Sequence, residues 1–548
     1  MRRLSRLLML VLPFVASACF PSRPKASNSE AKATAFEPLQ RCVALRGNGT
    51  HFVAHTAALA KITNRWGEVQ AMAGGSSGTI TILLYESILM NPAVNFLTGE
   101  DRNRAISLLL KSITGYAQEV MDAPEWKALI AVGTLAGRLK GESILDLPPD
   151  EFKKTAANLQ QIFMSDDIRN LINPEIIDSL DSSNSQNPQD YKNKVEEVKK
   201  AAISLVNLDA SDADVFFRPG LVNFSHFIGL VGRIADFYAG YGGSQSEMAG
   251  FIAACGSGTE EKTWKELAPK LTSQGTCQVR FAGLVREWRK NRETTTKSRL
   301  MDEQGSRLRS ITVTSVVTSP ATINILRQYK ENYQRGAARQ LNVNFDDIGF
   351  GYWVSSSFGV DPVKLWRESN GDGKSKKAIN LGSAKTWREI LEKSPREPSL
   401  GSYMEFAEGE TMAGALSLGG WADLHPVQVL KAAGCGKVIY VTRRGEETPF
   451  ISAGAPYNGR KKSGLAELLG MNESTYNDVF NVASPESGFS RALAQADGVW
   501  CTDWNRFAAS EQEGISADAW SAPLVTRDPS LKQWAEADSS GSQIVGCR

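Results

Sequence analysis

The sequence feature that most constrains the fold is a short segment in which a strand, a glycine turn and a helix follow one another. Residues 68–73 have the character of a buried strand and run directly into two glycines. Residues 78–90 are mostly apolar and predict a buried helix. The turn between them, residues 74–78, reads G-x-S-x-G with Ser76 at its centre. Because glycines permit the sharp bend that presents such a serine, the segment predicts a nucleophile turn in an α/β fold.

A second glycine turn follows another predicted strand, residues 42–45. Gly47, Asn48 and Gly49 lie at or next to the bend. The backbone N–H groups of a tight glycine turn can converge on one point, which suits an oxyanion. An ordinary turn or a nucleotide-phosphate loop is the alternative. Neither phosphate-loop pattern is present, since Phe52 stands where the last glycine of G-x-G-x-x-G would be.

Strand and helix patterns alternate at both ends of a long helical middle. Residues 311–318 are rich in β-branched side chains, and residues 426–433 and 437–442 have the patterns of a helix and a following strand. With 548 residues the chain is longer than one hydrophobic core usually serves. The order of elements predicts an α/β fold with a large helical insertion over residues 140–300.

The first nineteen residues have the pattern of an export signal. Three arginines lie within the first six residues, and the apolar run 7–18 is too short to span a bilayer. Cleavage after Ala18 gives a secreted protein. Alternatively, the run forms a bacterial lipobox, and Cys19 is lipidated and becomes the first mature residue. Residues 20–40 are rich in Ser, Ala, Lys and Pro and predict a flexible linker.

Of the seven cysteines, six remain once Cys19 is set aside. An even number is typical of a chain in an oxidising compartment, and six cysteines allow fifteen pairings. Cys255 and Cys277 are the most local candidate pair. The alternative is that several of the six are buried free thiols.

The two glycine turns and their spacing resemble the start of patatin-like phospholipases. In that family a turn of pattern G-G-G-x-[KR]-G supplies the oxyanion hole and G-x-S-x-G supplies the nucleophile; residues 47–52 and 74–78 match these positions. The family's D-G-[GA] motif resembles residues 418–427. The resemblance implies a three-layer α/β/α core over residues 41–450, including the helical insertion, and a C-terminal extension over residues 451–548.

Two departures from the family pattern concern catalytic groups. His51 stands where the family carries Lys or Arg, and Leu418 stands where the family carries the aspartate that takes the serine proton. Asp423 is the nearest carboxylate downstream and is one candidate for the base. A histidine, His51, His55 or His425, is a second candidate. In a third reading the site is inactive and the protein binds lipid without hydrolysing it.

The resemblance implies an exported lipid acyl hydrolase of the phospholipase A or esterase type. Ser76 would be the nucleophile, Asp423 the base, and the amides of Gly47, Asn48 and Gly49 the oxyanion hole. The implied partners are a phospholipid or other lipid ester and a membrane surface. The implied location is the bacterial cell envelope, as a lipid-anchored periplasmic or outer-membrane lipoprotein, with secretion as the alternative.

The remaining expectations concern auxiliary residues, cofactors, metals and nucleic acid. His51 and Ser77 are candidates for auxiliary roles beside the nucleophile. No cofactor is implied, and the four histidines form no zinc-binding pattern, so no metal is predicted. A net charge of +2 gives no electrostatic reason to expect a nucleic-acid partner. Asp497 precedes a glycine as in D-G-[GA], but the second glycine is missing, and a turn is predicted there.

Overall fold

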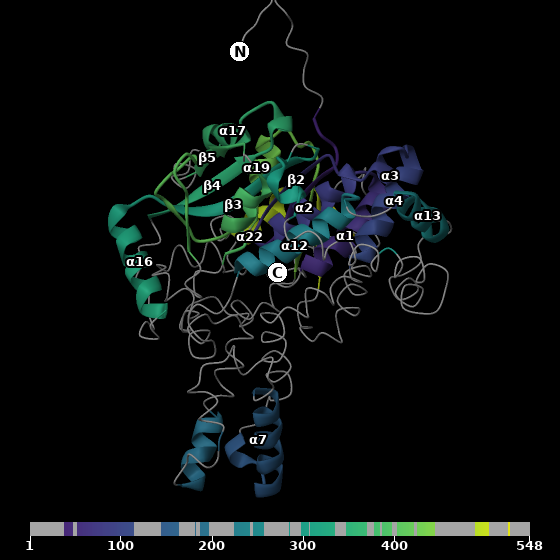
Figure 1. Cartoon of the computed structure of the whole chain (residues 1–548). Coiled ribbons are helices and arrows are strands. Elements are labelled where there is room, and N and C mark those ends of the chain that lie inside the picture. Colours follow the sequence, from purple (N-terminus) through teal and green to yellow (C-terminus); the bar gives the residue numbers. More distant parts are fainter. Residues whose placement is uncertain are drawn as a thin grey trace, which may run out of the picture. The chain divides into compact units, whose positions relative to one another are not determined.

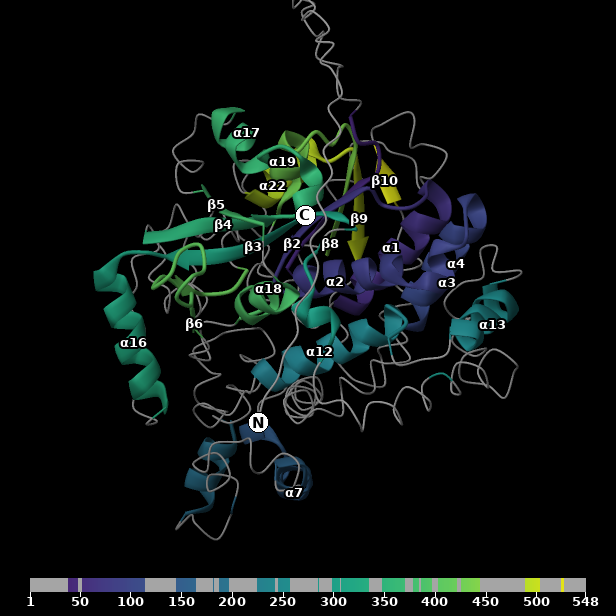
Figure 2. The same cartoon turned by 45° about the horizontal axis from the view of Figure 1, so that its top comes forward.

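The protein has an α/β fold, as the sequence predicts, with helices on both faces of one mostly parallel sheet (Figures 1 and 2). The computed structural model describes residues 38–47, 52–113, 144–163, 181, 187–196, 224–241, 245–256, 284, 298–305, 307–334, 347–369, 378–383, 386–396, 403–420, 425–443, 488–502 and 524–526. Apart from Pro38, all of them belong to one compact unit, Leu39–Arg548.

The described part of the sheet has ten strands in the order β10-β9-β8-β1-β2-β3-β4-β5, with the β6–β7 hairpin attached through β7 to β3. The four strands at its centre, β8, β1, β2 and β3, are mutually parallel. The strands are β1 (Cys42–Leu45), β2 (Ala71–Gly75), β3 (Arg309–Val317), β4 (Ile348–Val354), β5 (Ala378–Gly382), β6 (Met404–Glu405), β7 (Leu416–Ser417), β8 (Val438–Arg443), β9 (Gly498–Thr502) and β10 (Leu524–Thr526).

Helices connect the parallel strands, as such crossovers require. The described α-helices are α1 (Phe52–Trp66), α2 (Ser77–Met90), α3 (Pro92–Asn95), α4 (Gly99–Ser112), α7 (Pro149–Phe163), α12 (Phe224–Tyr238), α13 (Gln245–Gly256), α16 (Pro320–Gln334), α17 (Pro362–Ser369), α18 (Trp387–Lys393), α19 (Val427–Ala432) and α22 (Gly488–Gln495). Short 3-10 helices are η2 (Ile144–Asp146), η4 (Leu300–Asp302) and η6 (Ser356–Phe358).

Side chains of the central strands alternate between two hydrophobic cores, one on each face of the sheet. In β1, Val43 and Leu45 join the core built with α1, α2, α4, α12, α13 and α18. Cys42 and Ala44 join the opposite core, built with α16, α17, α19 and α22. Successive strand residues point to opposite faces, so strands buried on both sides are apolar without interruption, which is why β1 reads as a continuous apolar run.

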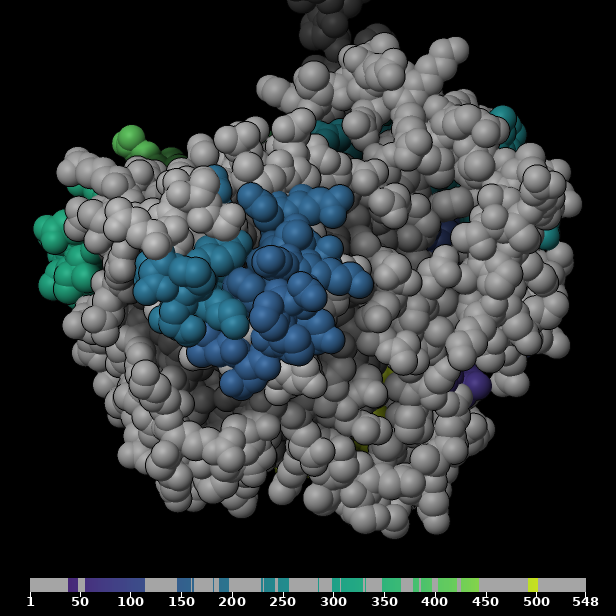
Figure 3. Space-filling view, turned by 90° about the horizontal axis from the view of Figure 1, so that it is seen from below, coloured from purple at the N-terminus to yellow at the C-terminus, as the bar shows by residue number. Residues whose placement is uncertain are grey.

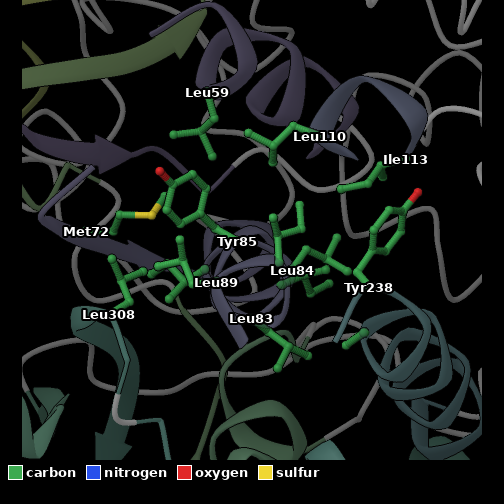
Figure 4. Close-up of a cluster of buried hydrophobic side chains, with 14 of the residues drawn as sticks. Leu59, Met72, Leu83, Leu84, Tyr85, Leu89, Leu110, Ile113, Tyr238 and Leu308 are labelled. Carbon is green, nitrogen blue, oxygen red and sulfur yellow. The ribbon is translucent and has the colours of Figure 1, made fainter. Parts of the chain in front are cut away.

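Helix α2 lies at the centre of the first core. Its residues from Ser77 to Leu89 are all buried. A helix with apolar residues all round its circumference is stable only inside a protein. Figure 4 shows part of its surroundings, with Tyr85 of α2 beside Leu59 of α1 and Leu110 of α4.

Part of the predicted insertion belongs to this same core. Helices α12 and α13 pack against α2, α3 and α4. Helix α7 lies beside residues 187–196 (Figure 3). The rings of Phe152 in α7 and Tyr191 lie 5.7 Å apart. Helices α12 and α13 therefore belong to the body of the fold, although they lie within the predicted insertion, residues 140–300.

The predicted C-terminal extension contributes to the sheet. Helix α22 packs in the second core, β9 pairs with β8 in parallel, and β10 pairs with β9. The sheet thus continues well beyond residue 450.

Candidate functional site

Ser76 lies on a sharp bend between β2 and α2. Its backbone angles are φ 53° and ψ −121°, outside the regions that a residue with a side chain ordinarily occupies. Ser76 is partly exposed, whereas Gly75 and Ser77 on either side are buried. The bend thus exposes Ser76, and not Ser77, at the carboxyl end of a central strand, which is the geometry that G-x-S-x-G predicts.

The two outer glycines of the motif lie in tight packing. A Cβ at Gly74 would lie 3.1 Å from the backbone of Gly78, because the helix folds back over the strand. A Cβ at Gly78 would lie 3.2 Å from the carbonyl oxygen of Leu45 in β1. Strand β2 also extends two residues further than the sequence predicts, to Gly75, since β1 and β3 hold its backbone from both sides.

The first glycine turn leaves the sheet beside the second. Leu45 of β1 pairs with Gly74 of β2 in parallel register. Both chains therefore leave the same edge of the sheet on adjacent strands, with half-buried Gly47 two residues beyond Leu45. Asn48, Gly49 and His51 lie outside the described residues, so their predicted roles stay predictions.

A third glycine segment is in direct contact with the bend. A Cβ at Gly420 would lie 2.3 Å from the backbone nitrogen of Ser76. Gly419 has φ 87°, and a Cβ there would lie 2.1 Å from the carbonyl oxygen of Arg396. The segment matched to D-G-[GA] thus lies against the turn at Ser76, and neighbouring backbone excludes a side chain at either glycine.

Backbone and hydroxyl groups fix this glycine segment to β3. The amide of Ser315 donates to the carbonyl of Gly419 at 2.6 Å. Thr314 Oγ1 and Ser417 Oγ lie 2.5 Å apart, and Ser417 Oγ donates to the carbonyl of Lys393 at 3.0 Å. These hydroxyl groups were not predicted as part of the site. The signal for Thr314 is the repeated serine and threonine within β3, an otherwise apolar strand. Ser417 lies in β7 and has no comparable signal.

The position that the resemblance to patatin-like phospholipases matches to their aspartate is apolar in this chain. Leu418 is 1% exposed and belongs to the second core. Asp423, the predicted base, lies outside the described residues. Ser77, the predicted auxiliary, is buried, and its carbonyl accepts a hydrogen bond from Thr81 Oγ1 at 3.1 Å.

Two of the candidate histidines are buried and bonded to other groups. His425 Nδ1 lies 2.5 Å from the hydroxyl of Tyr440 in β8. His55 Nδ1 lies 3.2 Å from Thr81 Oγ1 within the helical layer. Each ring thus has a hydrogen-bonding partner other than Ser76.

Asp497 has a structural role at the opposite edge of the sheet. Its Oδ2 accepts from the amide of Val438 at 2.7 Å and from Lys431 Nζ. Asp497 precedes β9, and Val438 begins β8 at the amino ends of the parallel strands. This carboxylate therefore serves the start of two strands and is remote from Ser76.

A buried cation follows β1 at the site edge. Arg46 is 2% exposed, and its Nη1 lies 3.5 Å from Thr442 Oγ1. Burial lowers the pKa of the Arg46 guanidinium below its ordinary value, with an opposing influence from Tyr440. The charge lies immediately before the glycine turn.

A disulfide joins Cys42 at the start of β1 to Cys435 after α19, with Cα atoms 6.1 Å apart. Cys255 is also disulfide-bonded. Its predicted pairing with Cys277 stays a prediction, because Cys277 is not among the described residues. Within the described ranges no three His, Cys, Asp or Glu side chains gather as a metal site. None of the helices in those ranges has the length and hydropathy that a membrane crossing requires.

Comparison with known proteins adds no relative: no protein-family model, no curated protein and no solved structure matches the chain.

Proposed function

We propose that the protein is a patatin-like serine acyl hydrolase acting on lipid esters, with Ser76 as its nucleophile. The observation that carries the proposal is the backbone of Ser76, strained at φ 53° and ψ −121° and partly exposed at the carboxyl end of β2. Strain of this kind persists only where the surrounding structure holds it, and it is concentrated at functional sites. An ordinary strand-to-helix connection does not require a residue in such a strained conformation.

Acyl transfer follows from this arrangement. Ser76 Oγ attacks the ester carbonyl carbon while the base takes its proton, and the carbonyl oxygen becomes an oxyanion. The amides of the turn at Gly47, Asn48 and Gly49 stabilise this charge, each donor contributing on the order of 10²–10³ in rate. The proton passes to the alcohol as it leaves, and water then releases the fatty acid by the same steps in reverse order.

Asp423 is the proposed base. It follows Gly420 by three residues, and the backbone of Gly420 adjoins Ser76. Three residues span at most about 10 Å, so the length of the chain allows Asp423 to reach the serine. A positioned base contributes about 10²–10⁴ in rate.

A lipid-binding or scaffold protein without activity is the competing function. Leu418 favours it, because a leucine buried in the core replaces the group that accepts the proton in the family. Such a protein would keep the fold and the membrane association but not the chemistry.

Reaction with a fluorophosphonate probe distinguishes the two functions. We expect the wild-type protein to be labelled and Ser76→Ala to be unlabelled. Ser356→Ala is a matched control, since Ser356 is an exposed serine after β4, at the other edge of the sheet. Absence of labelling in wild-type protein of native fold would favour the scaffold.

The proposed location is the cell envelope, by lipidation of Cys19. Incorporation of an alkyne-tagged fatty acid tests it: the wild-type chain should be tagged, and Cys19→Ser should not. Tagging of both proteins equally would exclude Cys19 as the anchor.

A further inference from the structure

The hydroxyl of Ser394 lies directly behind the nucleophile turn. Ser394 follows α18 and is fully buried. Its Oγ accepts a hydrogen bond from the amide of Ser76 at 3.1 Å and donates one to the carbonyl of Val313 in β3 at 2.6 Å. Thr79 Oγ1, in the first turn of α2, lies 2.7 Å away. One side chain thus contacts the strand, the bend and the helix.

The hydrogen-bonding capacity of Ser394 is completely used. A hydroxyl has one proton to donate and two lone pairs to accept with. The proton goes to the carbonyl of Val313, and the amide of Ser76 donates to one lone pair. Thr79 Oγ1 lies at the other lone pair, 2.7 Å away, and also 3.3 Å from the carbonyl of Gly74. Loss of this hydroxyl would remove the acceptor of the Ser76 amide, whereas Thr79 Oγ1 would keep the carbonyl of Gly74, 3.3 Å away, as a partner.

The bond to the amide of Ser76 bears directly on the strained bend. An unfavourable φ persists only when neighbouring groups specify the direction of the peptide. Ser394 does so from a rigid support, because its own proton is held by the central strand β3. The same bond occupies the Ser76 amide, which is therefore not a donor to the oxyanion.

We infer that Ser394 is a positioning residue that holds Ser76 in its attacking conformation by binding the serine's own backbone amide. This inference rests on the proposed hydrolase function for its effect on rate. The hydrogen bond itself is independent of that function.

The test compares Ser394→Ala and Ser394→Cys with wild-type protein. The cysteine variant has nearly the same shape but is a weak acceptor. Ser355→Ala is the matched control: Ser355 Oγ accepts from the amide of Ser310 in β3 at 2.8 Å, at the end of the strand away from Ser76. Two quantities are measured in each protein, the kinetics on p-nitrophenyl butyrate and hydrogen–deuterium exchange at the Ser76 amide.

We expect kcat of Ser394→Ala to fall on the order of tenfold to a hundredfold with KM changed less than about twofold, because misplacement of a nucleophile affects chemistry more than binding. Exchange at the Ser76 amide should accelerate. For Ser394→Cys, both kcat and the exchange rate at the Ser76 amide should lie between those of Ser394→Ala and wild type. If Ser394→Ala does not fold, these two values of Ser394→Cys test the inference. Ser355→Ala should keep both quantities at wild-type values.

Unchanged exchange at Ser76, or a loss of kcat no greater than that of Ser355→Ala, would overturn the inference. If the wild type hydrolyses the ester no faster than Ser76→Ala does, the proposed function fails. In that case the exchange measurement alone still decides whether Ser394 holds the amide.

Discussion

Replacement of Gly420 by alanine tests the contact between two segments that lie more than 340 residues apart in the chain. The new Cβ would lie 2.3 Å from the Ser76 nitrogen and 2.8 Å from the carbonyl carbon of Gly75. Ordinary contact begins near 3.4 Å. The backbones must therefore separate by about 1 Å, since neither obstacle is a side chain that could rotate away.

The expected loss follows from that displacement. Overpacking of a buried site costs about 1–3 kcal/mol, which outweighs the gain of about 0.4–1 kcal/mol from a stiffer unfolded chain. A misplacement of about 1 Å at a reacting group costs roughly 10²-fold in rate. We therefore expect Gly420→Ala to lower both the urea midpoint of unfolding and kcat on p-nitrophenyl butyrate.

Gly229→Ala is the matched control. Gly229 lies within α12, where a Cβ would meet only the tip of Arg233 at 3.7 Å. The same substitution should here raise stability by up to about 1 kcal/mol, because alanine favours the helix. A Gly420→Ala protein that is as stable and as active as the wild type would refute the close contact between the two glycine segments.

Three further outcomes are expected. Replacement of Cys42 and Cys435 by alanine should lower the free energy of unfolding on the order of 2–5 kcal/mol, as measured in urea without reductant, because the bond joins residues 393 positions apart. Asp423→Asn should slow ester hydrolysis about 10²–10⁴-fold while circular dichroism is unchanged; an undiminished rate would mean that another group is the base. Lys111→Met should raise the melting temperature at pH 7, and its advantage should shrink as the pH rises from about 8 towards 10.5. Burial lowers the pKa of Lys111 to about 8, so the folded chain releases this proton before the unfolded chain does, and wild-type stability rises across that interval.

Local patterns predicted the elements that carry the candidate nucleophile. The strand at residues 42–45, the G-x-S-x-G bend and the helix after it need only neighbouring residues to specify them, because a short apolar run flanked by glycines has few alternative structures. The strands and helix near residues 311 and 430 were predicted for the same reason.

Contacts between distant segments were not predictable in this way. Ser394 lies 318 residues from Ser76, and nothing around it differs from an ordinary helix end. Sequence distance favours a local pair such as Cys255 and Cys277, which stays a prediction. The bond between Cys42 of β1 and Cys435 before β8 depends instead on strand order, which sequence distance does not indicate. The positions of the antiparallel strand β4 and of the strands after residue 450 were not predictable either, because they depend on which edges of the parallel strands remain unpaired.

The placement of β1 between β2 and β8 has a consequence for how the chain is made. Its partner on one side is synthesised about 400 residues later, so one edge of β1 stays open while most of the protein emerges. At 5–20 residues per second the wait is about 20–80 s. The central sheet therefore cannot close until late in translation. Under the proposed export, this delay would leave the chain able to pass through a membrane channel.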